Sequence, residues 1–295
     1  MRIALLGLGL IGGSIARAVR ERGPGDALGS AGLVAWTPSG EGPAAAAGEG
    51  VIDEAAGSAE AAIADADLVV LAGPAPVCLE QLDSLAGPWR AALAPDAVIT
   101  DVASTKAAIV GRAEGLGLRF VGGHPMAGRE ISGYAGAQSD LFEGRPWVVV
   151  PTSGADAAAI ERVEELARTV GARPRRMAAD EHDAAVAAIS HLPLVVAAAL
   201  VDAVAGAPNH VRDGWPIASE LAATGWRDMT RLARGDVEMG SGIVATNASQ
   251  IASRLRDLVE VLEGWLADLE GEAPDAEAVS TRLRAARDRL ESMPR

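Results

Sequence analysis

Short apolar runs alternate with helical stretches through the first half of the chain. The runs have the length of β-strands and read RIALLG, GLVAW, ADLVVLAG, DAVITDV, LRFVGG and PWVVVP. Such alternation is typical of βαβ units, whose strands are parallel, and continuously apolar strands fit a sheet that is covered on both faces. A further helix is predicted within residues 152–170, followed by an edge strand at ARPRRM. The pattern therefore predicts an α/β domain with a parallel sheet.

Helical periodicity dominates from Ala178 onward. Residues 178–205 predict one long apolar helix, which Pro193 should kink or locally open because proline interrupts helical hydrogen bonding. Further helices are predicted in WPIASELAATGW, WRDMTRLARG, EMGSGIVATNASQIASRLRDLVEVLEGWLADLEG and AEAVSTRLRAARDRLES, with a loose joint at GEAP. We therefore expect two domains, an α/β domain at residues 1–177 and an all-α domain at residues 178–295.

A glycine-rich turn joins the first apolar run to the first helical stretch. The glycines are spaced as Gly7-x-Gly9-x-x-Gly12, which is the fingerprint of a dinucleotide-binding turn when a strand precedes it and a helix follows. The first glycine permits the tight turn, the second lets the backbone approach a pyrophosphate, and the third lets the helix pack close to the strand. The N–H groups at the helix start then bind the phosphates, which brings Leu10 and Ile11 into the expected cofactor site.

The residues after GLVAW bear on which nicotinamide cofactor binds. NAD enzymes usually place an acidic residue there for the ribose 2′-hydroxyl, whereas this chain has Thr37-Pro38-Ser39. No carboxylate in this turn repels the 2′-phosphate of NADP, and no Arg or Lys attracts it. We favour NAD and keep NADP open, and we count Gly73 and Pro74, after the third apolar run, among the expected cofactor contacts.

Composition narrows the class of protein further. The net charge of −14 argues against binding to nucleic acid or to an anionic membrane surface. We see no signal peptide and no uncharged apolar run that is long enough to span a bilayer. The single cysteine, Cys78, excludes an internal disulfide, suits the reducing cytoplasm and is expected to be a buried small hydrophobe. We therefore expect a cytoplasmic protein that acts on a small molecule.

Two of the four histidines stand in contexts that suggest chemistry. His124 lies in GGHPMAG directly after LRFV, at the carboxyl edge of a strand, where ligands bind in such sheets. It is either catalytic or a loop histidine that binds backbone groups. His191 lies in SHLP within the apolar helix, so it is either a core histidine or a wall of the site. The histidines and the cysteine show none of the spacings typical of a metal site.

Polar residues also follow the strand AVITDV. The sequence DVASTK places Ser104 where it can cap the next helix, with Asp101 and Thr105 as competitors. Because a capping hydroxyl can also contact a ligand, Ser104 is a second candidate for the site. Lys106 is expected to be a solvated surface lysine.

Two arginines offer a cationic patch in the second half of the chain. Arg227 and Arg231 are spaced i, i+4 in GWRDMTRLARG, which puts them on one face of a helix. The patch is either a solvated helix face, with Asp228 partly compensating, or a binding site for a carboxylate substrate. A planar guanidinium contacts a carboxylate through two hydrogen bonds, which suits the second interpretation.

Taken together, these motifs resemble the prephenate/arogenate dehydrogenase family of tyrosine biosynthesis. The matching segments are, in order, GLGLIGGSIARAV, ADLVVLAGP, DVASTK, FVGGHPMAG, LFEGRPWVVVP, ISHLPLVVAAAL and GWRDMTRLA. The resemblance implies a Rossmann-type domain followed by a helical substrate and dimerisation domain. It also implies NAD(P)-dependent oxidative decarboxylation of prephenate to 4-hydroxyphenylpyruvate, or of arogenate to tyrosine, with hydride transfer from ring C4 to the nicotinamide.

The same resemblance implies roles for the residues selected above. His124 is the expected acceptor of the 4-hydroxyl proton, and Ser104 is expected to bridge that hydroxyl, the histidine and the nicotinamide. Arg231 matches the arginine that binds a substrate carboxylate, Arg227 is a neighbouring basic position, and His191 is expected to shape the site. A homodimer through the helical domain is expected, and we expect no C-terminal ACT domain.

One departure from the family leaves the substrate open. Leu194 stands where some prephenate-specific members carry a second histidine, so arogenate remains an alternative, with Asp228 or Glu130 as the hypothesised partner of its ammonium group. A dehydrogenase for a modified prephenate, for example a 4-amino analogue in a specialised pathway, is also open.

Two hypotheses place the chain outside this family. A β-hydroxyacid-type dehydrogenase would carry a catalytic lysine in the long helix, where this chain has His182 and His191. A non-catalytic NAD-binding protein would have lost His124, Ser104 or Arg231, and all three are present. Both readings are therefore less favoured than the dehydrogenase of tyrosine biosynthesis.

Overall fold

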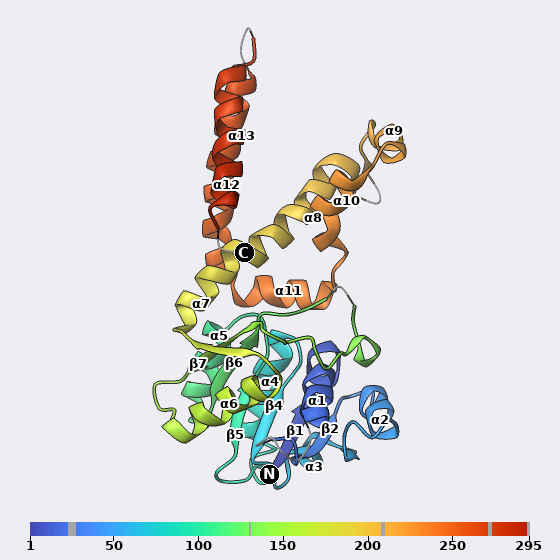
Figure 1. The fold of residues 1–295 in the computed structure, drawn as a ribbon, viewed down its shortest axis with the longest axis vertical. Coiled ribbons are helices and arrows are strands. Elements are labelled where there is room, and N and C mark those ends of the chain that lie inside the picture. The colour runs from blue at the N-terminus through green and yellow to red at the C-terminus, as the bar shows by residue number, and fades with distance from the viewer. Residues whose placement is uncertain (23–27, 130, 208–209, 271–272, 294–295) are drawn as a thin grey trace. The chain divides into compact units, whose positions relative to one another are not determined.

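The computed structural model describes residues 1–22, 28–129, 131–207, 210–270 and 273–293 (Figure 1). The chain forms two compact units, Met1–Ala248 and Ser249–Arg295. The first unit contains both main sheets and all helices up to α11 (Val237–Thr246). The second unit contains nearly all of α12 (Ala248–Leu269) and α13 (Ala276–Glu291).

A five-stranded parallel sheet is the centre of the first unit, as the apolar pattern predicts. Its strand order is β3-β2-β1-β4-β5, and the bounds are β1 Arg2–Leu6, β2 Gly32–Trp36, β3 Glu54–Ala55, β4 Leu68–Leu71 and β5 Val98–Asp101. The connecting helices are α1 Leu10–Arg22, α2 Glu41–Gly48, α3 Ala59–Ile63, α4 Ala75–Ala86 and α5 Ala107–Gly115. Ile3 and Leu5 of β1 belong to one buried cluster, while Ala4 and Leu6 belong to another. The sheet is therefore covered on both faces, which explains why its strands are continuously apolar.

A second sheet continues the first and contains one strand whose direction the sequence analysis got wrong. It has the order β6-β7-β8, with β6 Val121–Pro125, β7 Pro146–Pro151 and β8 Arg173–Arg176. β7 runs antiparallel to β6, although PWVVVP was predicted to join a parallel sheet. Among the described residues between these two strands, the 3-10 turn Tyr134–Gly136 is the only helical element. These residues therefore form no helical crossover of the kind that parallel neighbours need. Helix α6, Ala157–Thr169, provides such a crossover before β8, which is parallel to β7 and forms the predicted edge strand.

The long apolar helix opens locally next to Pro193, as predicted. It consists of α7 Ala179–Val186, a π-helical turn Ala187–His191 and α8 Leu192–Ala205. Proline removes one helical N–H donor and crowds the carbonyl four residues earlier, and a widened turn accommodates both effects. The combined stretch Ala179–Ala205 is long and apolar enough to cross a membrane by length and composition. The sequence-based expectation that no run reaches that length was therefore wrong.

The helices between α8 and α13 are shorter than the sequence pattern predicts, whereas α13 agrees with its predicted segment. After a small hairpin of β9 (Gly206–Ala207) and β10 (His210–Val211) come α9 Trp215–Glu220, α10 Thr224–Thr230 and a 3-10 turn Arg231–Arg234. The segment EMGSGIVATNASQIASRLRDLVEVLEGWLADLEG was predicted as one helix, but it is divided at Asn247 into α11 and α12. The side chain of Asn247 bonds to distant groups, described below, and this tertiary contact fixes the break. GEAP lies partly outside the described residues.

Candidate active site

The three glycines of the first turn have different surroundings, which match the roles expected from their spacing. Gly7 has φ +115°, and a Cβ there would lie 2.6 Å from the carbonyl oxygen of Ala72. A Cβ on Gly12 would lie 2.3 Å from the carbonyl oxygen of Gly7. A Cβ on Gly9 would meet nothing within 4 Å. Gly7 and Gly12 are thus required by the fold itself, whereas Gly9 faces open space at the start of α1.

The other expected cofactor residues lie at the same edge of the sheet as the glycine turn. Thr37 and Ser39 follow β2, Gly73 and Pro74 follow β4, and Ser104 follows β5. The carboxyl ends of neighbouring parallel strands share one edge, so these residues line the edge where dinucleotides bind. The hydroxyls of Thr37 and Ser39 accept backbone N–H groups of their own turn, at 3.1 and 3.4 Å.

Cys78 is buried in the packing of α4, as the sequence analysis expects. Its side chain is 0% exposed, and its Sγ lies 3.3 Å from the carbonyl oxygen of Gly73. Burial, followed by the negative charge of Asp101, raises the pKa of the thiol to about 12. The thiolate is therefore scarce at neutral pH, and Cys78 is not a nucleophile.

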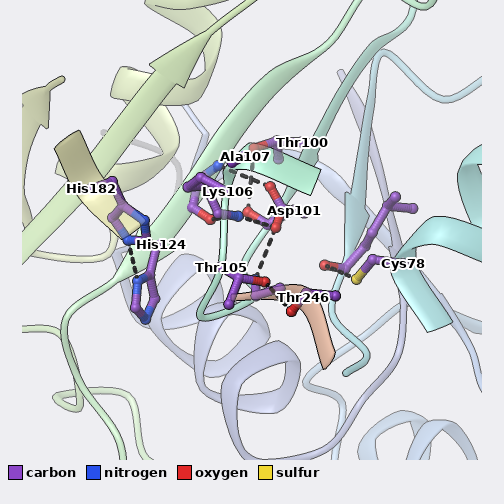
Figure 2. Close-up of polar contacts among 12 residues, drawn as sticks. Cys78, Thr100, Asp101, Thr105, Lys106, Ala107, His124, His182 and Thr246 are labelled. Atoms are coloured by element: carbon purple, nitrogen blue, oxygen red, sulfur yellow. Dashed lines mark hydrogen bonds and ion pairs between the residues drawn. The ribbon is translucent and has the colours of Figure 1, made fainter. Parts of the chain in front are cut away.

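Lys106 is buried in an ion pair, contrary to the prediction of a solvated lysine. Both Lys106 and Asp101 are 0% exposed, and the Lys106 ammonium contacts the Asp101 carboxylate (Figure 2). Lys106 Nζ also donates to the carbonyl oxygen of Gly123 at 2.7 Å, while Asp101 accepts from the Gly123 N–H at 3.1 Å. The pair thus holds both backbone groups of the residue before His124. Lys106 is the only lysine of the sequence, a signal that the sequence analysis did not use.

His124 lies at the end of β6 and contacts a second histidine. It is paired with Val148 inside the strand, although the sequence analysis placed it just after the strand. Its Nδ1 lies 2.8 Å from Nε2 of His182 on α7, and the two rings meet edge to face at 75° (Figure 2). His182 is 1% exposed, whereas His124 is half-buried. His124 is therefore the member of the pair that solvent, and by extension a substrate, can reach.

Asp183 caps helix α5 from a distant element. Its carboxylate accepts the backbone N–H groups of Lys106 at 2.7 Å and Ala107 at 2.9 Å. This corrects the prediction that Ser104, with Asp101 or Thr105 as competitors, caps this helix. The hydroxyl of Thr105 instead pairs with that of Thr246 at 2.8 Å. The sequence could not reveal the cap, because Asp183 lies on α7, far away along the chain.

The Asp183 carboxylate also bonds to its neighbour in sequence, His182. His182 Nδ1 lies 2.7 Å from Asp183 Oδ1. Asn247, at the break between α11 and α12, donates its amide to the carbonyl oxygen of Asp183 at 2.9 Å and lies 3.1 Å from His191 Nδ1. His191 Nε2 is buried and has no hydrogen-bond partner among the described residues. The sequence analysis missed Asp183 and Asn247. The sequence does offer a signal for Asp183, because a charged residue beside a histidine in an apolar helix needs a polar partner.

Burial and neighbouring charges set the protonation of this cluster. Burial, assisted by His182, Lys106 and His191, lowers the pKa of His124 well below 6.5. Burial likewise lowers the pKa of His191 to about 4. Burial alone would raise the pKa of Asp183, but hydrogen bonds from His182 and from the α5 N–H groups outweigh it and lower that pKa. At neutral pH the cluster thus contains neutral His124 and His191 beside an ionised Asp183.

Two family models match the chain. The nucleotide-binding domain of prephenate dehydrogenase matches residues 15–175, and its dimerization domain matches residues 178–272. The chain belongs to the prephenate dehydrogenase family. This confirms the predicted fold class, a nucleotide-binding domain followed by a helical domain, and it confirms that the protein is an oxidoreductase. It also favours this family over the β-hydroxyacid-type and non-catalytic readings.

Relatives and solved structures agree with the family. Prephenate dehydrogenase of Bacillus subtilis (strain 168) is 34% identical over 295 residues, which are 99% of this chain and 76% of that protein. Prephenate dehydrogenase from A. aeolicus, in complex with hydroxyphenyl propionate and NAD+, is 28% identical with a TM-score of 0.83 and covers 99% of this chain and 98% of its own. Synechocystis arogenate dehydrogenase is 31% identical with a TM-score of 0.77 and covers 98% of this chain and 100% of its own.

The two arginines expected in the substrate site, Arg227 and Arg231, lie on α10 and at the start of the 3-10 turn that follows it, and both are exposed. Both segments pack against α8 (Figure 1). The hydrogen bonds described above for the histidine cluster come from β6, α7, the π-helical turn and Asn247. Asp228 is also exposed on α10, and Glu130 lies outside the described residues.

The buried histidines make the stability of the dehydrogenase depend on pH. His124 and His191 have folded-state pKa values below the 6.5 of an unfolded histidine, and that of His191 is about 4. Between these values the unfolded chain binds more protons, so the free energy of unfolding should fall as the pH drops from about 6.5 towards 4. Urea unfolding at a series of pH values measures this. His210→Gln, which removes an exposed histidine, should leave the slope unchanged. A free energy of unfolding that stays constant between these pH values would contradict the lowered pKa values of His124 and His191.

Proposed function

We propose that this enzyme catalyses NAD-dependent oxidative decarboxylation of prephenate, arogenate or both, to 4-hydroxyphenylpyruvate or tyrosine. The observation that carries the proposal is a neutral, half-buried histidine at the cofactor edge of the sheet. β6 follows a parallel bridge between Ile99 and Phe120, so it runs in the direction of β5. Its carboxyl end, with His124, therefore reaches the edge where the glycine turn also lies.

The residues at this edge fit a dinucleotide. Gly9, Leu10 and Ile11 at the start of α1 would hold the pyrophosphate, in a turn that Gly7 and Gly12 make possible. The remaining contacts are proposed for Thr37, Ser39, Gly73, Pro74 and Ser104. When bound, NAD supplies the nicotinamide carbon that accepts a hydride. Because the turn after β2 has neither an acid nor a base, NAD is proposed and NADP is the alternative to test.

The chemistry assigned to this chain is removal of one proton while the ring is oxidised. As hydride leaves ring C4, His124 accepts the proton of the 4-hydroxyl, so a carbonyl forms at C4. The bond to the ring carboxylate then breaks, CO₂ leaves, and its electron pair completes an aromatic phenolate, which takes the proton back from His124 to give the phenol. Ser104 is proposed to hydrogen-bond the 4-hydroxyl beside His124. Arg231 is proposed to bind a substrate carboxylate, with Arg227 as a second cation and His191 as a wall of the site.

We also propose a domain boundary, a homodimer interface and a cellular location for this enzyme. The boundary between domains is placed at residues 177 and 178, and the helical domain is proposed to form the homodimer interface. One support is the family model of a dimerization domain, which matches residues 178–272. A second is the exposure of the apolar stretch Ala179–Ala205, whose most apolar window is only 22% buried within one chain. A cytoplasmic location is proposed because the acidic chain has one cysteine, which is buried.

A grid of assays tests the proposed reaction. The enzyme is given prephenate or arogenate, each with NAD or NADP, and formation of reduced nicotinamide is followed by its absorbance. We expect turnover with at least one ring substrate, and faster turnover with NAD than with NADP. No turnover with either substrate, in a protein that still binds NAD by calorimetry, would overturn the substrate assignment while leaving the fold intact.

Two glycine variants separate cofactor binding from folding. Gly9→Ala places a methyl group in open space, so the protein should fold normally while the KM for NAD rises roughly tenfold or more, because the methyl obstructs the pyrophosphate. Gly12→Ala places its methyl 2.3 Å from the Gly7 carbonyl oxygen and should lower the melting temperature instead. Calorimetric NAD titration and thermal unfolding measure the two effects. Unchanged NAD affinity in Gly9→Ala would remove the turn from the cofactor site.

A further inference from the structure

The hydrogen bonds around Asp183 determine which nitrogen of His182 carries a proton. The ionised carboxylate only accepts hydrogen bonds, and it accepts them from the backbone N–H groups of Lys106 and Ala107 and from His182. His182 Nδ1, which contacts Asp183 Oδ1, must therefore carry a hydrogen. In neutral His182 the other nitrogen, Nε2, is then a hydrogen-bond acceptor.

That acceptor fixes the tautomer of the histidine that faces the substrate. His182 Nε2 lies 2.8 Å from His124 Nδ1, so His124 Nδ1 must carry the hydrogen of this bond. His124 Nε2 is left with a free lone pair. We propose that His182 and Asp183 form a positioning pair, which holds His124 in the tautomer that presents Nε2 as the proton acceptor. This inference rests on the proposed function, since it extends the role of His124 in that reaction.

The same pair also stabilises the charge that His124 acquires during the reaction. The groups that face His124 include the ammonium of Lys106 and the ring of His191, and neither favours a second positive charge there. The charge of Asp101 is matched by Lys106. Asp183 is the carboxylate that a chain of hydrogen bonds connects to His124, through His182. An acid that orients a histidine and balances its charge is a recurring device in enzymes that use histidine as a base.

The position of the pair is set by several elements at once. The α5 N–H groups fix the Asp183 carboxylate, and the Asn247 amide fixes its backbone carbonyl. His182 and Asp183 are 1% and 2% exposed, so bulk water does not compete for these bonds. Rigid support of this kind holds a catalytic group in productive geometry. Tautomer selection therefore depends on the packing of α7 against α5 and on the hydrogen bond from Asn247 to α7.

Two substitutions of His182 distinguish positioning from simple packing. The amide of His182→Asn can take the place of Nδ1 and still donate to Asp183, but it is too short to reach His124. The longer His182→Gln can place its amide oxygen where Nε2 was and accept the bond from His124. Both side chains are polar and similar in kind, so a difference between them reports the contact with His124. His210→Gln, at an exposed histidine, is the matched control.

Nitrogen-15 NMR of histidine-labelled protein reads the tautomer directly, and the chain has only four histidines to assign. Without substrate, we expect His124 with hydrogen on Nδ1 in the unmodified protein, in His182→Gln and in His210→Gln. In His182→Asn this preference should be lost. Because no turnover is involved, this measurement stands even if the proposed substrate proves wrong.

Kinetics then show what the tautomer contributes. We expect His182→Asn to lower kcat by about 10²-fold with little change in KM for substrate or NAD, and His182→Gln to recover most of the loss. The pH below which kcat declines should change in His182→Asn and stay the same in His210→Gln. Equal tautomers and equal kcat values in the Asn and Gln variants would overturn the proposal.

Discussion

Replacement of His124 by asparagine will lower kcat by about 10²- to 10⁴-fold, the usual contribution of a positioned acid or base. The reason is that the half-buried His124 is neutral and hydrogen-bonded to His182, and so is ready to accept a proton. The expected loss falls on kcat rather than on NAD binding, because the glycine turn lies on a different strand and helix. Steady-state kinetics and calorimetric NAD titration measure the two quantities.

The pH profile gives a second test of His124. Its pKa lies well below 6.5, so the unmodified enzyme should keep its activity as the pH falls below 6.5 and lose it only when His124 becomes protonated. In His124→Asn this acidic limb should disappear from the residual rate. The exposed His210 supplies the control, since His210→Asn should change neither the rate nor the limb. A loss in His124→Asn of less than about tenfold would show that another group accepts the proton.

Replacement of Lys106 by methionine will lower the free energy of unfolding by about 3–5 kcal/mol, the usual cost of removing one partner of a buried ion pair. Lys106 and Asp101 are both 0% exposed, so the carboxylate that remains would be buried without its counter-charge. The Gly123 carbonyl oxygen would lose its donor as well. Urea unfolding followed by circular dichroism measures the effect, and loss of kcat should accompany it because Gly123 precedes His124.

A double variant separates the charge from the shape of this pair. Asp101→Asn combined with Lys106→Met removes both charges, so it should destabilise the protein by less than the sum of the two single variants. Lys106→Arg should also be destabilising, because a planar guanidinium is larger than the ammonium it replaces in a fully buried position. If Lys106→Met unfolds at the same urea concentration as the unmodified protein, the pair does not support the fold as described.

Some features of the fold follow from short stretches of sequence. Gly7 and Gly12 lie within one turn, and a side chain at either position would collide with backbone of the same β1–α1 region or of neighbouring β4. Strand-length apolar runs predicted the parallel sheet, and Pro193 predicted the local opening that appears as a π-helical turn. Spacing of this kind is sufficient because each feature depends on residues that are close along the chain.

The features that the sequence analysis missed depend on partners far along the chain. Lys106 was expected in solvent because its sequence neighbours do not show that Gly123, on another strand, accepts a hydrogen bond from it beside Asp101. Asp183 was overlooked as the cap of α5, although it accepts N–H groups that lie more than seventy residues earlier. The predicted direction of β7 was wrong because a parallel strand needs a helical crossover, and the described residues between β6 and β7 form none.

The sequence by itself determined the glycine turn, the order of the main strands, the family and the histidine at the sheet edge. These depend on periodicity, on glycine conformation and on motifs that are local. Only the tertiary structure decided that His124 is connected through His182 to Asp183, and that one buried ion pair holds its strand. The physical reason is that a polar side chain is stable in the interior only beside its partner, and the fold alone decides which distant residue becomes that partner.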